Sequence, residues 1–274
     1  MNETLAFVGG GQMAAAMIGG LLADGHAPAR IAVVEPNAER ADILRKQYGV
    51  TVRAAAADTV RGAACVVLAV KPQVMADALR GLKLAPGITV LSIAAGVRLA
   101  SLRAALGPEV HLVRSMPNTP AQLRAGISGL YAEPAVPANA RALAAAVLAA
   151  VGEVVWVERE ELLDAVTALS GSGPAYFFAL VEALREGGAA LGLDAEVAAK
   201  LALRTFIGAA RIAAESGEDV AKLRANVTSK GGTTEAALQS LESAGLKRIF
   251  RDALATAAAR GKELGDRLAT GAQS

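Results

Sequence analysis

Residues 5–14 read LAFVGGGQMA, a short apolar run followed directly by three glycines and then by an alanine-rich segment. This order predicts a strand over 5–8, a tight turn, and a helix that begins near Met13. The small residues required by the turn G-x-G-x-x-G/A are Gly9, Gly11 and Ala14, with Gly10, Gln12 and Met13 between them. Such a turn opens a dinucleotide-binding β/α domain.

Each small residue of the turn has a physical reason. Gly9 permits the tight turn, Gly11 lets the backbone approach a pyrophosphate, and Ala14 lets the helix pack closely on the strand. The phosphates of a ligand would then meet the free N–H groups at the helix N-terminus. A glycine turn without a ligand is the alternative, but the flanking strand and helix favour dinucleotide binding.

Outward from this turn, short apolar runs alternate with segments of helical periodicity. The expected strands lie at 5–8, 31–34, 65–70, 89–93 and 112–114, and the expected helices at 13–23, 38–48, 74–82 and 99–106. This alternation predicts a parallel sheet with helices on its faces, which is an α/β architecture. Two later apolar runs, 127–131 and 154–157, are expected to extend the sheet.

The pattern changes after Trp156, and from Glu160 onward we expect helices only. They lie at 161–169, 175–191, 195–216, 220–224, 234–243 and 246–268. We therefore predict a dinucleotide-binding domain at 1–158 and an all-α domain at 159–274. Small and apolar residues on several helix faces favour a subunit interface, and hence a homo-oligomer, over a monomeric bundle.

Length, composition and charge argue against several classes of function. The 274 residues suit two domains, and apolar runs such as 142–151 fall well short of the roughly 20 residues of a membrane span. A formal net charge of +2 from scattered residues and an aromatic content of 3% argue against nucleic-acid binding. No targeting segment is recognisable, and Cys65 is the only cysteine. We expect a cytoplasmic protein, no membrane partner, and a buried structural thiol.

An acidic residue, Glu35, ends the second expected strand about twenty residues beyond the turn, where such a group binds the ribose hydroxyls of NAD. An acid here repels the 2′-phosphate of NADP, although Asn37 and Arg40 lie close by and could offset this effect. The alternative is a solvated turn residue before Pro36. The choice between NADPH and NADH therefore stays open.

Further candidate residues follow the ends of later strands, where open parallel sheets bind their ligands. For the cofactor these residues are Ala69, Val70, Lys71, Pro72, Ala94 and Ala95. For a substrate the candidate is Asn118, which lies between two prolines just past an expected strand end. Its alternative role is to stabilise that turn.

The segment 229–234 runs into an expected helix, and its glycines expose backbone N–H groups. Because a helix N-terminus attracts anions, a substrate carboxylate fits this place. The segment consists of Ser229, Lys230, Gly231, Gly232, Thr233 and Thr234, and it follows Val227. The Thr234 hydroxyl can both donate and accept a hydrogen bond. The alternative is an ordinary helix start with Thr233 or Thr234 as the N-cap.

Six segments together resemble the pyrroline-5-carboxylate reductase family over nearly the whole chain. They read FVGGGQM at 7–13, AVKP at 69–72, SIAAGV at 92–97, MPNTP at 116–120, LSGSGPAY at 169–176 and NVTSKGGTT at 226–234. The last segment is the most specific, because generic dinucleotide folds lack it. Many members have proline in place of Lys230, and some place an asparagine against the adenosine ribose where this chain has alanines at 54–57.

The resemblance implies a Rossmann domain, a helical dimerisation domain and often a higher oligomer of dimers. It implies the final step of proline biosynthesis, in which NADPH or NADH reduces the C=N bond of 1-pyrroline-5-carboxylate to give L-proline. It also implies that Thr234 contacts the ring nitrogen of this cyclic imine and is the catalytic residue.

The residues suit imine reduction better than two rival functions. Hydride addition neutralises an iminium carbon, so no general acid is required, and neither His26 nor His111 has a catalytic partner arrangement in the sequence. No metal-ligand cluster is visible either, so no metal is expected. Hydroxyacid dehydrogenases usually carry a lysine on the first interdomain helix, whereas 171–182 contains none. A dinucleotide sensor without turnover would not need the segment 229–234.

Overall fold

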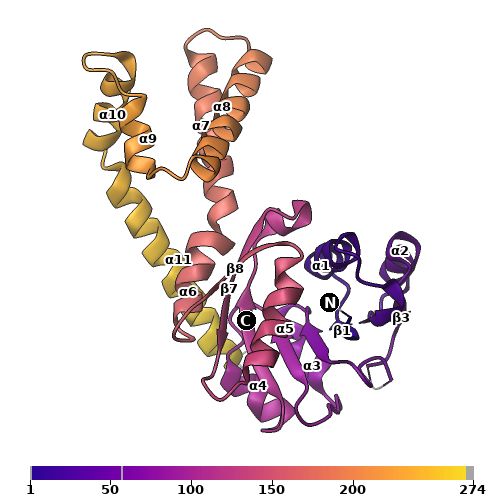
Figure 1. Ribbon diagram of the computed structural model, residues 1–274. Helices are drawn as coiled ribbons and strands as arrows, with labels where there is room; N and C mark the ends of the chain where they lie inside the picture. Colours follow the sequence, from indigo (N-terminus) through magenta and orange to yellow (C-terminus); the bar gives the residue numbers. More distant parts are fainter. Residues whose placement is uncertain (1, 57, 270–274) are drawn as a thin grey trace. The chain divides into compact units, whose positions relative to one another are not determined.

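The described strands form one sheet in the order β3-β2-β1-β4-β5-β6-β7-β8 (Figure 1). The structure is a computed structural model that describes residues 2–56 and 58–269. The strands are β1 Leu5–Val8, β2 Ile31–Val34, β3 Thr51–Arg53, β4 Cys65–Leu68, β5 Thr89–Ser92, β6 His111–Met116, β7 Gly126–Ala132 and β8 Gly152–Trp156. All expected strands are present, and the short edge strand β3, with only Val52 buried, was not predicted.

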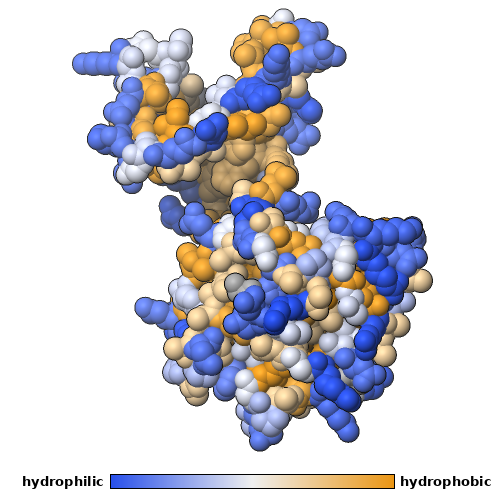
Figure 2. Space-filling model, turned by 45° about the vertical axis from the view of Figure 1, so that its right-hand side comes forward, coloured by the Kyte–Doolittle hydropathy of each residue, from blue (hydrophilic) through white to orange (hydrophobic). Residues whose placement is uncertain are grey.

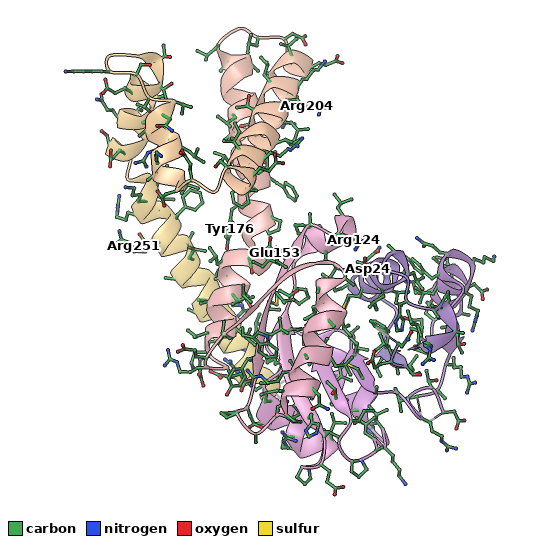
Figure 3. All side chains as sticks on the ribbon, viewed as in Figure 1. Asp24, Arg124, Glu153, Tyr176, Arg204 and Arg251 are labelled. Atoms are coloured by element: carbon green, nitrogen blue, oxygen red, sulfur yellow. The ribbon has the colours of Figure 1, made fainter. Side chains whose placement is uncertain are left out.

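The predicted parallel sheet is correct except at one pairing, because β6 and β7 run antiparallel. The connection between them holds only the short 3-10 helix η3, Thr119–Leu123, which is too short for the crossover that parallel strands require. After η3, Arg124 adopts a left-handed conformation with φ 58°. Its side chain pairs with Asp24 and donates to the Ala150 carbonyl oxygen at 3.1 Å, which offsets the backbone strain (Figure 3).

Helices cover both faces of the sheet, and alternate strand residues supply two separate cores. Phe7 lies in one core with residues of α1, α2 and α5, whereas Ala6 and Val8 lie in the other with residues of α3 and α4. The helices are α1 Gln12–Ala23, α2 Ala38–Tyr48, α3 Met75–Leu79, α4 Leu99–Leu106 and α5 Ala138–Ala149, with 3-10 turns η1 Pro28–Arg30 and η2 Pro72–Val74. Helix α5 was not predicted.

The single cysteine is wholly buried in the central strand β4, as expected of a structural thiol. Burial raises the pKa of Cys65 to about 12. The thiol therefore stays protonated at neutral pH and has no nucleophilic role.

By compactness the chain divides into two units. The sheet unit comprises the described residues up to Ser172 and from Thr256 onward, and the helical unit is Gly173–Ala255. Helix α6, Leu162–Val166, and the π-helical turn η4, Thr167–Gly171, close the first part of the sheet unit. The functional boundary expected near residue 158 stays a prediction.

The last helix returns to the sheet unit and touches the loop after β5. Helix α11 is Leu246–Ala269, and its Gly265 lies against Gly96. A Cβ on Gly265 would lie 2.9 Å from the Gly96 carbonyl oxygen, so the two backbones are in direct contact.

The helical unit contains few buried apolar residues of its own. Its helices are α7 Gly173–Ala190, α8 Ala195–Glu215, α9 Val220–Asn226, α10 Thr233–Ser243 and the start of α11, and no strand occurs between Gly173 and Ala255. Helices α7 and α8 pack together, with the Phe177 and Phe206 rings 5.5 Å apart. Only Ala198 and Ala202 are buried hydrophobic residues there, and Figure 2 shows hydrophobic patches over these helices. None of the described helices has both the length and the apolar character needed to cross a bilayer.

We expect Gly20→Ala to destabilise the sheet unit, because the new Cβ would lie 2.3 Å from the Ala150 carbonyl oxygen. Overpacking of this kind costs about 1–3 kcal/mol of unfolding free energy, measurable by urea denaturation. The matched control is Gly19→Ala in the same helix, whose Cβ would meet only Tyr48, at 3.4 Å. The control should be neutral or slightly stabilising, and equal effects of the two changes would contradict the packing argument.

Candidate functional site

The turn after β1 leaves no room for a side chain at its first glycine. Gly9 has φ +101°, and a Cβ there would lie 2.8 Å from Val70 Cγ1 and 2.9 Å from the Ala69 carbonyl oxygen. The Gly9 N–H donates to the Val34 carbonyl oxygen at 2.9 Å, which ties the turn to β2. The left-handed conformation and the close contact with the end of β4 both require glycine.

The third glycine, Gly11, faces open space instead. No heavy atom lies within 4 Å of the position that its Cβ would occupy. Gly11 is the N-cap of α1, without a side-chain capping bond and without an acidic residue in the first turn. Ala14 is fully buried beneath this first turn. The N–H groups of the helix N-terminus are therefore open to an anion, and the binding of a dinucleotide pyrophosphate by residues 9–14 stays a prediction.

The carboxylate of Glu35, just after β2, is held by two backbone N–H groups. Gly10 donates to Oε2 at 3.0 Å, and Asn37 donates to Oε1 at 2.9 Å. Asn37 also caps α2, because its Oδ1 accepts from the Arg40 N–H at 2.8 Å. Glu35 is thus fixed at the glycine turn, and the alternative of a merely solvated turn residue does not hold.

Arg40 reaches the same turn from the first turn of α2, a contact that the sequence did not predict. Its Nε donates to the Gly10 carbonyl oxygen at 2.6 Å, and its Nη2 donates to the Gly11 carbonyl oxygen at 3.3 Å. Gly10 is therefore bound by Glu35 through its N–H and by Arg40 through its carbonyl. Glu35 and Arg40 together fix the glycine turn against the segment between β2 and α2.

The other predicted cofactor residues lie beyond the ends of β4 and β5. Strand β4 ends at Leu68, and the Ala69 N–H continues the pairing by donating to the Val8 carbonyl oxygen at 2.8 Å. The Ala69 carbonyl oxygen lies against Gly9. Lys71, just before Pro72, is exposed. After β5, Ala94 is buried and Ala95 is exposed. Residues 69–72 and 94–95 therefore follow the carboxyl ends of the neighbouring strands β4 and β5.

Asn118 is buried, and both ends of its side-chain amide are hydrogen-bonded. Its Oδ1 accepts from the Ile127 N–H at 3.0 Å, and its Nδ2 donates to the Ser170 carbonyl oxygen at 3.2 Å. The amide thus connects the loop after β6 to the start of β7 and to the π-helical turn. The turn-stabilising role is present, while a direct contact of Asn118 with substrate stays a prediction.

Two partly buried ion pairs near this π-helical turn were not predicted. Arg98 Nη2 lies 2.6 Å from Asp164 Oδ2, and Arg114 Nη1 lies 3.0 Å from Glu160 Oε1. Burial lowers the pKa of Arg114, and the neighbouring Glu160 carboxylate counteracts part of that effect. The first pair joins α6 to the loop after β5, and the second joins the turn before α6 to β6. No local sequence signal reveals partners that lie 66 and 46 residues apart.

In the helical unit, the predicted substrate segment forms the loop between α9 and α10 and the start of α10. Gly232 is the N-cap of α10 without a side-chain capping bond, so neither Thr233 nor Thr234 is the N-cap. Thr234 is half-buried in the first turn, and no hydrogen bond of its hydroxyl occurs among the described residues. The ordinary helix-cap alternative therefore does not hold for either threonine.

The same loop is shaped by Glu235, which was not predicted. Its Oε2 accepts from the Gly231 N–H at 2.7 Å, and Gly231 has φ +73°. An acid in the first turn that reaches back to the preceding backbone is a known capping signal and could have been found in the sequence. Val227, Ser229 and Lys230 are exposed on the loop.

A hollow of roughly 660 Å³ opens beside this loop within the helical unit. Its lining includes Thr228, the two acids Glu235 and Glu242, and the four basic residues Arg224, Lys247, Arg248 and Arg251. Positive charge therefore gathers next to the segment expected to bind a carboxylate. Among the described residues, no group of three or more His, Cys, Asp and Glu is placed to hold a metal ion.

Comparison with protein families finds two matching regions. Residues 160–264 match the pyrroline-5-carboxylate reductase dimerisation domain. Residues 4–96 match the family described as NADP oxidoreductase, coenzyme F420-dependent. The two matches coincide with the helical second half and with the glycine turn and the strands that follow it.

Individual relatives extend the similarity over nearly the whole chain. A pyrroline-5-carboxylate reductase of Pseudomonas aeruginosa is 45% identical over 96% of this chain and 97% of its own. A solved structure of this enzyme from Coxiella burnetii has a TM-score of 0.91 at 40% identity, covering 96% and 99% of the two chains. The Plasmodium falciparum enzyme with NADP bound has a TM-score of 0.81 at 27% identity, covering 96% and 98%.

We expect Gly11→Ala to weaken NAD(P)H binding without destabilising the fold. The Cβ would meet no protein atom within 4 Å, but it would occupy the space where a pyrophosphate approaches the backbone. Fluorescence titration should show about a tenfold or greater rise in Kd, the size expected from loss of one charge-assisted contact, at an unchanged melting temperature. A variant that unfolds, or that binds as tightly as the parent, would contradict this reading of the turn.

Proposed function

The chain belongs to the pyrroline-5-carboxylate reductase family, and from that premise we propose how its residues carry out the reaction. The activity is the NAD(P)H-dependent reduction of the C=N bond of 1-pyrroline-5-carboxylate to L-proline, the final step of proline biosynthesis. When bound, the nicotinamide cofactor supplies the hydride. Residues 1–158 are proposed to form the domain that binds this cofactor. Residues 159–274 are proposed to form the domain that binds the substrate and makes the dimer.

The cofactor is proposed to lie along the carboxyl edge of the sheet. Residues 9–14 receive the pyrophosphate, and the side chains near Glu35 receive the adenosine ribose. Ala69, Val70, Lys71 and Pro72 border the pyrophosphate and ribose, and Ala94 and Ala95 let the nicotinamide ribose approach the backbone. Support comes from the open space at Gly11 and the uncapped N-terminus of α1.

The start of α10 is the single observation that supports the substrate site best. It combines a glycine N-cap without a side-chain bond, an uncommitted Thr234 hydroxyl and a neighbouring basic hollow. A helix N-terminus in such surroundings stabilises a carboxylate. We propose that residues 227–234 bind the carboxylate of the imine and that Thr234 bonds its ring nitrogen.

These residues suit a reaction that requires positioning more than acid–base chemistry. Hydride addition neutralises the iminium carbon, so no alkoxide develops that would need a general acid. A hydroxyl and backbone N–H groups are sufficient to fix the ring relative to the hydride donor. Asn118 is proposed to contribute by fixing the loop after β6, and also by direct contact with substrate.

The protein is a homo-oligomer in this proposal, built from dimers formed by the helical unit. The large hydrophobic residues exposed on α7 and α8 include Phe178, which is 69% exposed, and Leu201, which is 53% exposed. Large exposed apolar patches of this kind mark interaction sites in soluble proteins. The match to a dimerisation domain supports a second copy as that partner. The number of dimers and the expected cytoplasmic location stay predictions.

The Thr234→Ala variant should lower kcat/KM for the imine by about tenfold or more, the size of one lost active-site hydrogen bond. The measurement is imine-dependent loss of NADPH and NADH absorbance. Thr234→Ser, which keeps the hydroxyl, should restore most of the rate. Ser240→Ala, further along the same helix, is the control for general effects on α10. Normal kinetics in folded Thr234→Ala would remove this residue from the mechanism.

The Phe178→Asp variant should dissociate the oligomer, because burying a new carboxylate in an apolar interface is strongly unfavourable. Light scattering after size-exclusion chromatography measures the mass directly. Phe178→Leu keeps the position apolar and should leave the assembly intact. A monomeric parent protein, or an unchanged mass for the aspartate variant, would contradict the proposed interface.

A further inference from the structure

We propose that Glu35 makes this chain prefer NADH to NADPH. The inference rests on the proposed function, since it concerns how the same cofactor site distinguishes a ribose 2′-hydroxyl from a 2′-phosphate. It is based on the contacts of the glycine turn with Glu35 and Arg40, an acid and a base that affect this choice in opposite directions.

Protein contacts alone orient the Glu35 carboxylate. Its Oε2 is 3.0 Å from the Gly10 nitrogen and its Oε1 is 2.9 Å from the Asn37 nitrogen, so each oxygen accepts one backbone N–H. The backbone of Glu35 is fixed as well, because its N–H donates to the Arg53 carbonyl oxygen at 2.9 Å. The carboxylate is therefore held beside the glycine turn, and moving it away would break two hydrogen bonds to the backbone.

A fixed carboxylate discriminates chemically between the two cofactors. A carboxylate is an acceptor with about four lone-pair sites, of which the two backbone contacts use one on each oxygen. The remaining sites can accept the ribose 2′- and 3′-hydroxyls of NADH. The 2′-phosphate of NADPH offers acceptors and negative charge instead of a hydroxyl donor, so it meets repulsion at the same place.

Arg40 does not compensate fully, because its guanidinium is already bound to the glycine turn. Arg40 donates from Nε to the Gly10 carbonyl oxygen at 2.6 Å and from Nη2 to the Gly11 carbonyl oxygen at 3.3 Å. A 2′-phosphate could recruit this guanidinium only through its remaining N–H groups or by breaking these bonds. Farther along α2, Arg45 is paired with Asp42 at 2.7 Å and also donates to the Val52 carbonyl oxygen at 2.8 Å.

The test is direct binding of NADH and NADPH to the full-length protein, followed by cofactor fluorescence without any imine. The parent should bind NADH about tenfold or more tightly than NADPH, the range expected from one charge-assisted hydrogen bond gained or lost. Glu35→Gln keeps the shape, removes the charge and adds an N–H donor, so it should reduce this preference by about tenfold or more.

Glu39→Gln is the matched control, because Glu39 is an exposed acid in the first turn of α2. It makes the same change of net charge and should leave the ratio of the two Kd values unchanged. Tighter binding of NADPH by the parent, or equal shifts in the two glutamine variants, would overturn the proposed role of Glu35. Binding of both cofactors without imine-dependent turnover would instead overturn the proposed function alone.

Discussion

The contact between Gly9 and the end of β4 is the constraint on which the rest of the cofactor site depends. Because no Cβ fits between this residue and the Ala69 carbonyl, β1 can turn sharply into α1 while remaining paired with β2 and β4. That geometry brings the N-terminus of α1 to the carboxyl edge of the sheet with Gly11 in open space. Glu35 and Arg40 then hold Gly10 through its N–H and its carbonyl, so the turn proposed to bind the phosphates is joined to the side chain proposed to bind the ribose.

A second set of interactions stabilises the opposite part of the sheet unit. The Arg98–Asp164 pair attaches α6 to the loop after β5, and the Arg114–Glu160 pair attaches the turn before α6 to β6. Asn118 connects three further segments nearby through its amide. A π-helical turn follows α6 at this place, and such turns are frequent at functional sites. Buried charges of this kind stabilise a fold little in net terms, but they specify one arrangement of the groups they join.

The helical unit differs from the sheet unit in how little apolar surface it buries. It buries only Ala198 and Ala202 among its hydrophobic residues and exposes large apolar side chains along α7 and α8. A monomer would therefore leave much apolar surface in water, which favours assembly with a second copy. Within the unit, a glycine and not a threonine caps α10, and the hydroxyls of Thr233 and Thr234 make no hydrogen bond within the described part of the chain. Association and substrate binding are thus proposed for the same group of helices.

The sequence by itself determined the elements whose signals are local. The glycine turn, the apolar strand runs and the glycine-marked helix ends predicted the α/β half and the helical half, and the six family segments identified the activity. It missed β3, whose three residues bury only Val52, and the antiparallel pairing of β7, which depends on a connection too short for a crossover. Only the tertiary structure decided which side chains meet. The Arg40 contacts with the turn and the Arg98–Asp164 pair join residues 30 and 66 positions apart, and such pairs form through packing of whole elements, which no local pattern of residues specifies.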